Sequence, residues 1–172
     1  MRSKMIIPAA CLLLAALMLV AGCTGTAEKP RAAPGDNVSV DYTVSFLNGT
    51  VYESSVGRAP LTFTLGKGKV IAGFDKAVTG LAVNESVNVT IPVEEAYGEY
   101  NSTLVIIVPR ESLPADTGMG QRFVFPNIDS KHVYTVTAVN ETTLMLDGNH
   151  PLAGNDLRFS ITLLSLQKAA AA

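Results

Sequence analysis

Cysteine is scarce in this chain of 172 residues, which contains only Cys11 and Cys23. Cys11 lies inside an apolar N-terminal run, and Cys23 follows directly after that run. The rest of the chain therefore holds no pair of thiols that could form a disulfide bond. A domain built from this sequence must be stabilised by its hydrophobic core, and about 150 residues suffice for one domain or for a domain with an insert.

Basic residues and metal ligands are also few. The chain has 13 lysines and arginines against 15 aspartates and glutamates, and setting aside Arg2 and Lys4 leaves 11 against 15, a net charge of −4. This mild acidity, without clusters of basic residues, argues against binding to nucleic acid. The two histidines, His132 and His150, are far apart in the sequence, so we expect no metal site.

The glycine-rich stretch 61–74 lacks the patterns of a nucleotide-binding loop. It begins as an alternating strand, turns through Gly66 and Gly68, and continues into an apolar helix start. A dinucleotide fingerprint needs glycine where Ile71 stands, and a phosphate-binding loop needs Ser or Thr where Val70 stands. We therefore predict that this stretch forms the floor of a shallow apolar pocket, and we expect no cofactor.

The N-terminal residues have the pattern of an export signal. Arg2 and Lys4 precede an uncharged apolar run, and the small residues before Cys23 resemble a lipobox, where the thiol is lipidated and the chain is cut before it. We predict a lipoprotein signal peptide over 1–22, lipidation of Cys23 and a flexible tether over 23–35. The alternative is an uncleaved membrane helix, for which a run of about 17 residues is marginal. Both interpretations place the folded part outside the cytoplasm, anchored to the cell membrane.

Asparagine is concentrated in acceptor sequons for N-glycosylation. About 15% of the residues are Ser or Thr, so chance would place only about one or two of the nine asparagines in an Asn-x-Ser/Thr triplet. The excess is typical of an exported protein from a cell that glycosylates its surface, and the alternative is that Asn-x-Thr simply suits Thr-rich strands. Six sequons begin at Asn37, Asn48, Asn84, Asn88, Asn101 and Asn140.

Alternating apolar residues predict an α+β fold that is mostly antiparallel β. The longest such pattern has Val38, Val40 and Val44 on one face, and Asn48-Gly49 predicts a hairpin. The stretch 72–81 is the only convincing helix. The predicted domains are a parent domain over 36–100 and 149–168, a small inserted β domain over 101–148, and a disordered tail over 169–172.

Short motifs along the parent domain carry a family resemblance. In order they are Val-Asp-Tyr (40–42), Tyr-Glu-Ser-Ser (52–55), Leu-Gly-x-Gly-x-Val-Ile-x-Gly-Phe (65–74) and Ala-Tyr-Gly (96–98). This series resembles the FKBP-type peptidyl-prolyl isomerases. Gly-Asn-His-Pro-Leu-Ala-Gly (148–154), followed by a Phe-bearing strand, resembles the SlyD-like branch, in which an insert-in-flap chaperone domain interrupts the isomerase. The resemblance implies an FKBP-like sheet wrapped on one short helix.

The resemblance also implies the site residues. Two of them differ from the usual family pattern: Glu53 stands where an aspartate is common, and Leu61 stands where an aromatic residue is common. Phe74 replaces a frequent tryptophan and keeps a flat apolar floor. The implied catalytic residues are Tyr42, Glu53, Ile71 through its backbone N–H, and Tyr97. The implied substrate-binding residues are Tyr52, Leu61, Val70, Phe74 and Phe159.

The predicted insert carries more apolar surface than so small a unit can easily bury. By resemblance it would capture unfolded or proline-containing polypeptides and deliver their prolines to the pocket, whereas the simpler interpretation is that these residues form its own core. We expect a monomeric peptidyl-prolyl isomerase with chaperone activity for exported proteins. The alternatives are a non-catalytic binding module on the same fold and, less favoured, an adhesin-like lipoprotein. The predicted chaperone surface comprises Leu104, Ile106, Val108, Phe123 and Phe125.

Overall fold

The computed structural model describes residues 29–125 and 129–170, so the predicted signal peptide, Cys23 and the start of the predicted tether lie outside the described residues. Two antiparallel sheets and one short α-helix make up the described fold, which confirms the predicted α+β class. Three short 3-10 turns complete the regular structure within these ranges. Among the described residues, no helix is both long enough and apolar enough to cross a membrane.

The first sheet is organised around strands β1 and β9, which pair along ten residues of β1. The strand order is β2-β1-β9-β4, and β3 pairs with the first part of β1 while β2 pairs with its last part. Val38 and Val40 point into the core because alternate residues of a strand face the same side. The five strands are β1 (Asn37–Phe46), β2 (Val51–Ser54), β3 (Leu61–Thr64), β4 (Ser86–Ile91) and β9 (Leu157–Gln167).

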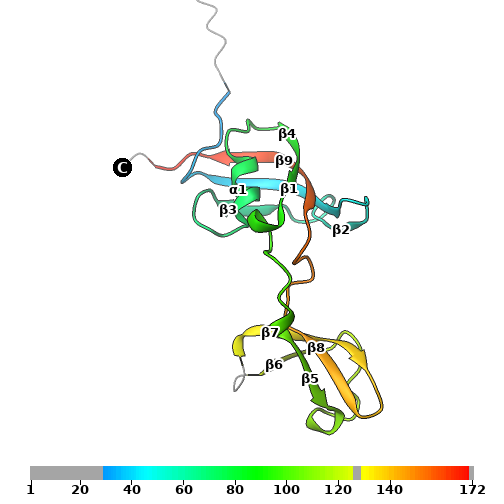
Figure 1. The fold of residues 1–172 in the computed structure, drawn as a ribbon. Coiled ribbons are helices and arrows are strands. Elements are labelled where there is room, and N and C mark those ends of the chain that lie inside the picture. Colours follow the sequence, from blue (N-terminus) through cyan, green and yellow to red (C-terminus); the bar gives the residue numbers. More distant parts are fainter. Residues whose placement is uncertain (1–28, 126–128, 171–172) are drawn as a thin grey trace, which may run out of the picture.

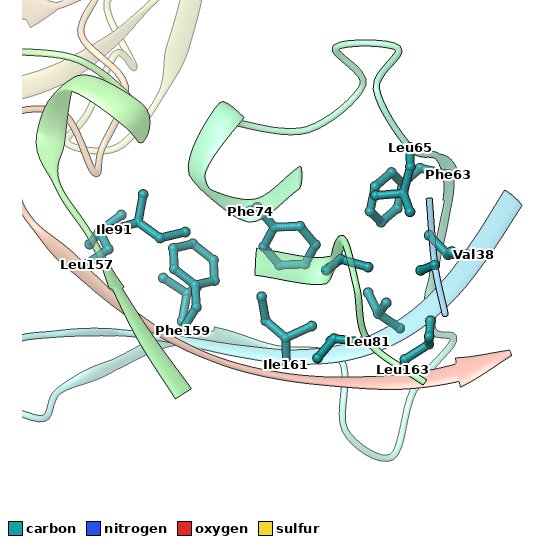
Figure 2. Packing of buried hydrophobic residues seen from close by; sticks show 14 of the residues in the cluster. Val38, Phe63, Leu65, Phe74, Leu81, Ile91, Leu157, Phe159, Ile161 and Leu163 are labelled. Carbon is teal, nitrogen blue, oxygen red and sulfur yellow. The ribbon is translucent and has the colours of Figure 1, made fainter. Parts of the chain in front are cut away.

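Helix α1 (Ala72–Val78) lies across one face of this sheet, and the main core fills the space between them (Figure 1). Figure 2 shows Phe74 reaching from the helix toward Phe159 and Ile161 of β9. Gly73 permits this close approach, because a Cβ atom at that position would lie 2.3 Å from Cγ2 of Ile91 on β4. The sheet, the helix and the aromatic residues between them therefore pack together as one core.

The helix ends three residues earlier than its apolar pattern predicts. The prediction covered 72–81, but Thr79 is already extended, with ψ 129°, and Gly80 has φ 89°. A positive φ is readily adopted by glycine and ends a helix. Leu81 is nevertheless buried, because the chain turns back onto the core after the helix. Its burial explains why its side chain matched the helical pattern.

The second sheet has four strands, all within residues 105–147, in the order β5-β8-β7-β6. Its buried residues form a separate cluster that shares no member with the main core. Figure 1 shows this sheet at a distance from the first, joined to it by two neighbouring chain segments. The strands are β5 (Val105–Pro109), β6 (Arg122–Phe125), β7 (Asp129–Val139) and β8 (Thr143–Asp147), and the 3-10 turns are η1 (Val93–Glu95), η2 (Ser102–Leu104) and η3 (Arg110–Ser112).

The two connecting segments are tied to each other by polar contacts. The Asn101 N–H donates to the Asn149 side-chain oxygen at 2.9 Å, and the Asn149 amide nitrogen donates back to the Asn101 carbonyl at 2.9 Å. The Tyr100 hydroxyl donates to the Asp147 carboxylate at 2.8 Å. These contacts hold the entry and exit of the second sheet side by side.

The predicted tether is wrong for residues 31–35, which are docked onto the first domain. Ala32 is only 3% exposed. Its N–H donates to the Leu81 carbonyl at 2.8 Å, and its carbonyl accepts from the Gly80 N–H at 2.8 Å. The small side chains of this stretch, which favoured a linker, are what allow it to lie flat against the turn after α1.

Asp36 fastens this docked stretch to the end of the last strand. Its buried carboxylate accepts from the Ala33 N–H, from the Lys168 ammonium at 2.9 Å and from the Ala169 N–H at 2.9 Å. The hydrogen bonds from Lys168 and then Ala169 hold the pKa of Asp36 below its usual value. The predicted disordered tail over 169–172 is therefore wrong at Ala169, whose backbone is held by this carboxylate.

Candidate active site

An aromatic cluster around Phe74 forms the base of the candidate site. The Phe74 ring meets Phe159 edge-on at 5.5 Å between centroids, Tyr42 edge-on at 5.9 Å, and Phe63 at 5.9 Å. Edge-to-face pairs of this kind stabilise a packed cluster beyond the area that they bury. Phe74 and Phe159 are each only 3% exposed, so they underlie the site rather than line its opening.

A cleft of about 180 Å³ opens beside Tyr42, between β1, β2 and the start of β3. Three of the residues predicted from the sequence, Tyr42, Glu53 and Leu61, line it together. The structure thus brings residues of three strands, β1, β2 and the start of β3, to the same place. The other lining residues are Ser54, Ser55, Arg58, Ala59 and Pro60.

A polar network behind this cleft was missed by the sequence interpretation. The buried Ser55 hydroxyl accepts from the Tyr42 N–H at 2.9 Å and donates to the Asp41 carboxylate at 2.9 Å. The Ser55 N–H in turn donates to the Tyr42 carbonyl at 2.9 Å. These bonds fix the backbone at Tyr42 and therefore the direction of its side chain. Both Asp41 and Ser55 belong to the motifs that carried the resemblance, but neither pattern assigned them a role.

The hydroxyl groups of Tyr42 and Tyr97, near the mouth of the cleft, both have a raised pKa. Burial raises the pKa of Tyr42, and the charge and hydrogen bond of the neighbouring Glu53 carboxylate raise it further. Burial also raises the pKa of Tyr97, with smaller contributions from Glu53 and Tyr52. A phenol that ionises only at high pH remains a hydrogen-bond donor throughout the physiological range. Two such donors therefore lie near one carboxylate at this site.

Tyr97 is held by a partner that the sequence interpretation did not identify. Its ring stacks on the His150 imidazole, with centroids 3.9 Å apart and planes inclined by 6°. His150 accepts from the Leu152 N–H through Nδ1 at 3.1 Å, which places its proton on Nε2. The loop of Tyr97 is tied to the same segment by a bond from the Gly154 N–H to the Gly98 carbonyl at 2.8 Å. No periodic pattern connects residues 97 and 150, so only the resemblance could have linked them.

Ile71 presents a backbone donor at the start of α1. Its carbonyl accepts from the Phe74 and Asp75 N–H groups at 3.1 Å each. Its own N–H has no hydrogen-bond partner within residues 29–125 and 129–170. The side chains of Ile71 and Val70 are half-buried and pack against the main core. This arrangement is consistent with the predicted role of the Ile71 N–H as an anchor for a substrate carbonyl, which stays a prediction.

The predicted chaperone surface is wrong in its choice of face for the insert strands. Ile106, Val108, Phe123 and Phe125 are half-buried and pack on the buried cluster of the second sheet. Leu104 is also half-buried, in η2 before β5. The exposed apolar residues are their neighbours on the opposite face. Ile107 is 66% exposed and pairs with Met145, which is 38% exposed, and Val124 pairs with Val133.

A groove of about 540 Å³ runs between the two sheets on the side of Tyr52 and His150. Its other wall consists of residues from β6 and β7, including Arg122 and Val133. Tyr52 is exposed and its ring lies edge-on to Phe46 at 6.3 Å. Tyr97 links this groove to the cleft, because its ring stacks on His150 of the groove and the Glu53 carboxylate of the cleft contributes to its raised pKa.

Acidification below pH 6.5 is expected to weaken the Tyr97–His150 stack. Burial lowers the pKa of His150 from 6.5, so the unfolded chain takes up this proton at a higher pH than the folded chain. The contribution of neutral His150 to the free energy of unfolding is therefore complete above pH 6.5. It is lost as the pH falls through the pKa of His150 in the folded protein. NMR titration of the His150 ring gives that pKa directly. His150→Phe, which retains a ring without a titrating group, should abolish the pH dependence, and a folded pKa of 6.5 or above would contradict the expectation.

The described chain combines a five-stranded antiparallel sheet, one short helix and an aromatic-based cleft with a second small sheet whose strands precede the last strand. Residues 28–164 match the family described as FKBP-type peptidyl-prolyl cis-trans isomerase, and the chain belongs to this family. The predicted enzyme class is thereby confirmed.

Similar proteins come from several bacteria, and each of the following is described as FKBP-type peptidyl-prolyl cis-trans isomerase SlyD. The protein from Aeromonas hydrophila is 34% identical over 142 residues, which cover 82% of this chain and 67% of that protein. The Escherichia coli K12 protein is 31% identical over 134 residues, covering 77% and 68%. The protein from Treponema pallidum (strain Nichols) is 34% identical over 134 residues, covering 77% and 76%. The predicted relation to the SlyD type of isomerase is supported by these matches.

Proposed function

We propose that this isomerase assists the folding of exported proteins at the outer surface of the cell membrane, with its second sheet acting as a holding domain for unfolded chain. The observation that carries the proposal is the position of Tyr97: Glu53 of the cleft contributes to its raised pKa, and its ring stacks on His150 of a groove that reaches β6 and β7 of the second sheet. An extended polypeptide held there places a nearby proline beside Tyr42 and Glu53 without dissociating.

The chemistry in the cleft requires no nucleophile. Rotation about the prolyl peptide bond is slow because it destroys amide resonance, at a barrier of about 18–20 kcal/mol. Resonance places negative charge on the carbonyl oxygen, and water stabilises this planar form. Transfer of the imide to an apolar site removes that stabilisation and favours the twisted state. A site that binds the twisted amide more tightly lowers the barrier directly, and each thousandfold acceleration needs about 4 kcal/mol of such differential binding.

Each described group has a part in this step. The aromatic cluster under Tyr42 gives the proline ring an apolar base. The Ile71 N–H is free to hold a substrate carbonyl, and the Tyr97 hydroxyl is positioned by its stack to donate to another. Glu53 and Tyr42 set the polarity at the mouth. The difference in substrate hydrogen bonding between the planar and twisted states supplies the differential binding.

The holding role rests on the apolar face opposite the insert's own core. Ile107 and Met145 are cross-strand partners, and both side chains are exposed. Val124 and Val133 repeat this arrangement on the other two strands. Exposed apolar residues on so small a sheet favour contact with other apolar chains. Weak binding to this face raises the concentration of substrate proline near the cleft.

The membrane location rests on the N-terminal pattern that ends at Cys23. Residues 31–36 are docked at the end of the first domain far from the second sheet (Figure 1). A lipid on Cys23 would therefore attach the protein to the membrane through the end of the first domain that lies away from the second sheet. This orientation suits a holdase for newly exported chains.

Mass spectrometry of the protein extracted from its native membrane tests the anchor. The expected N-terminal peptide begins at Cys23 and carries the mass of a lipid. An intact N-terminus with an unmodified Cys23 thiol contradicts lipidation and supports an uncleaved membrane helix. Cys23→Ser is the matched variant, because it removes the thiol with little change in size and is expected to release or misprocess the protein.

A further inference from the structure

The structure separates the asparagines of this chain into two groups. Six of the nine begin an Asn-x-Ser/Thr triplet, and all six of these are exposed. Within the described ranges, none of their side-chain nitrogens donates a hydrogen bond. Asn127, one of the remaining three, lies outside the described residues. N-glycosylation takes place on surface sequons, and the new bond to the sugar is made by the side-chain nitrogen.

The two described asparagines outside sequons differ in both respects, because they are half-buried and their amide nitrogens donate hydrogen bonds. Asn149 is half-buried, and its amide nitrogen donates to the Asn101 carbonyl at 2.9 Å and to the Asp147 carboxylate at 2.7 Å. Asn155 is half-buried, and its amide nitrogen donates to the Ala153 carbonyl at 2.9 Å. Structural asparagines are thus used for hydrogen bonding here, whereas sequon asparagines are not held through that nitrogen.

Three sequons lie in turns and end in threonine. The Asn48 side-chain oxygen accepts from the Thr50 N–H at 2.9 Å in the β1–β2 hairpin. The Asn101 oxygen accepts from the Thr103 N–H at 2.9 Å and from the Thr103 hydroxyl at 2.7 Å. In both turns the carbonyl end of the side chain is fixed and the nitrogen is left available. Asn140 lies in the turn between β7 and β8, where its backbone N–H donates to the Thr143 carbonyl.

We propose that the protein is N-glycosylated at Asn48, Asn101 and Asn140. The donor is an oligosaccharide linked through phosphate to a membrane lipid, and a membrane-bound transferase catalyses the step. A bond forms between the asparagine Nδ2 and C1 of the first sugar, and the C1–O bond to the phosphate breaks. The lipid phosphate leaves with that electron pair, and one Nδ2 proton passes to a base of the transferase.

These positions leave the isomerase site open. None of the three asparagines is among the residues that line the cleft beside Tyr42 or the groove beside Tyr52. The side-chain oxygens that cap the turns at Asn48 and Asn101 keep their acceptor role in a glycosylated asparagine, because only the nitrogen is substituted. Glycans at these turns therefore cover surface loops without displacing a hydrogen bond that is made by the asparagine side chains.

Glycopeptide mass spectrometry of the full-length protein purified from its native cells tests the proposal. The expected result is added sugar mass on the peptides of Asn48, Asn101 and Asn140, with Asn149 and Asn155 unmodified as internal controls. Unmodified asparagine at all three turn positions overturns the proposal. The same spectra report the N-terminal peptide at Cys23, so failure of glycosylation and failure of the membrane anchor are distinguished.

A matched pair of variants at Thr50 identifies the sequon as the determinant. The Thr50 hydroxyl makes no hydrogen bond to the described residues, so neither variant is expected to disturb the hairpin. Thr50→Ala removes the sequon hydroxyl and should abolish sugar mass on Asn48. Thr50→Ser retains the hydroxyl and should preserve it. Sugar on Asn48 in the Thr50→Ala protein overturns the assignment.

Discussion

Replacement of Phe74 by alanine is expected to lower the free energy of unfolding by about 3–5 kcal/mol, the usual cost of removing a buried aromatic ring. Phe74 has three aromatic neighbours and lies in the centre of the core between α1 and β9. Its loss leaves a cavity beneath Tyr42, so the apolar base of the cleft is lost together with stability. Isomerase activity is expected to disappear.

Urea unfolding followed by tyrosine fluorescence measures the stability change for Phe74→Ala. Phe74→Leu is the matched control, because it keeps most of the apolar volume and should cost less while retaining part of the activity. Tyr52→Ala, at an exposed ring, should change stability little. A loss below about 1 kcal/mol for Phe74→Ala, well under the range for such substitutions, would contradict the assignment of this residue to the core.

Removal of residues 101–148, with Tyr100 joined to Asn149, is expected to lower isomerisation of an unfolded protein substrate by about a hundredfold, the scale on which effective concentration acts. The holding surface is lost, whereas the cleft is retained. The main core includes no residue from this segment, and the chain ends at the cut lie side by side because Asn101 and Asn149 bond to each other. The shortened protein should therefore fold.

Two substrates distinguish holding from chemistry in this deletion. Refolding of a proline-limited protein should be strongly slowed relative to the full-length enzyme. Isomerisation of a short proline peptide, which is too small to reach the second sheet, should be nearly unchanged. Equal losses with both substrates would show instead that the insert is needed for the cleft itself. If the deletion variant is as active as the full-length enzyme toward both substrates, the holding role is refuted.

The strands that could be predicted from the sequence are those with one solvent-exposed face and one buried face. Strand β1 alternates because Val38, Val40 and Val44 face the helix while the residues between them are more exposed. The run 104–108 is apolar at every position, so alternation could not decide which side faces inward. For that reason the predicted chaperone surface consists of half-buried residues and does not include the exposed Ile107.

The unpredicted part of the site consists of contacts between distant residues. The stack of Tyr97 on His150 and the bonds among Asp41, Tyr42 and Ser55 exist only once the sheet has formed. Neither leaves a periodic trace in the sequence. The docking of Ala32 was missed for a different reason, because small residues are equally compatible with a free linker and with a close fit against a turn.

NMR exchange spectroscopy on a short proline peptide tests the central claim, that the Tyr42–Glu53 cleft above Phe74 catalyses prolyl isomerisation. Cis and trans forms give separate signals, and without a catalyst they interconvert over tens to hundreds of seconds. We expect the exchange rate to rise in proportion to enzyme concentration. An exchange rate equal to that in buffer, with binding of the peptide still detectable, would contradict the account and identify the protein as a non-catalytic binding module.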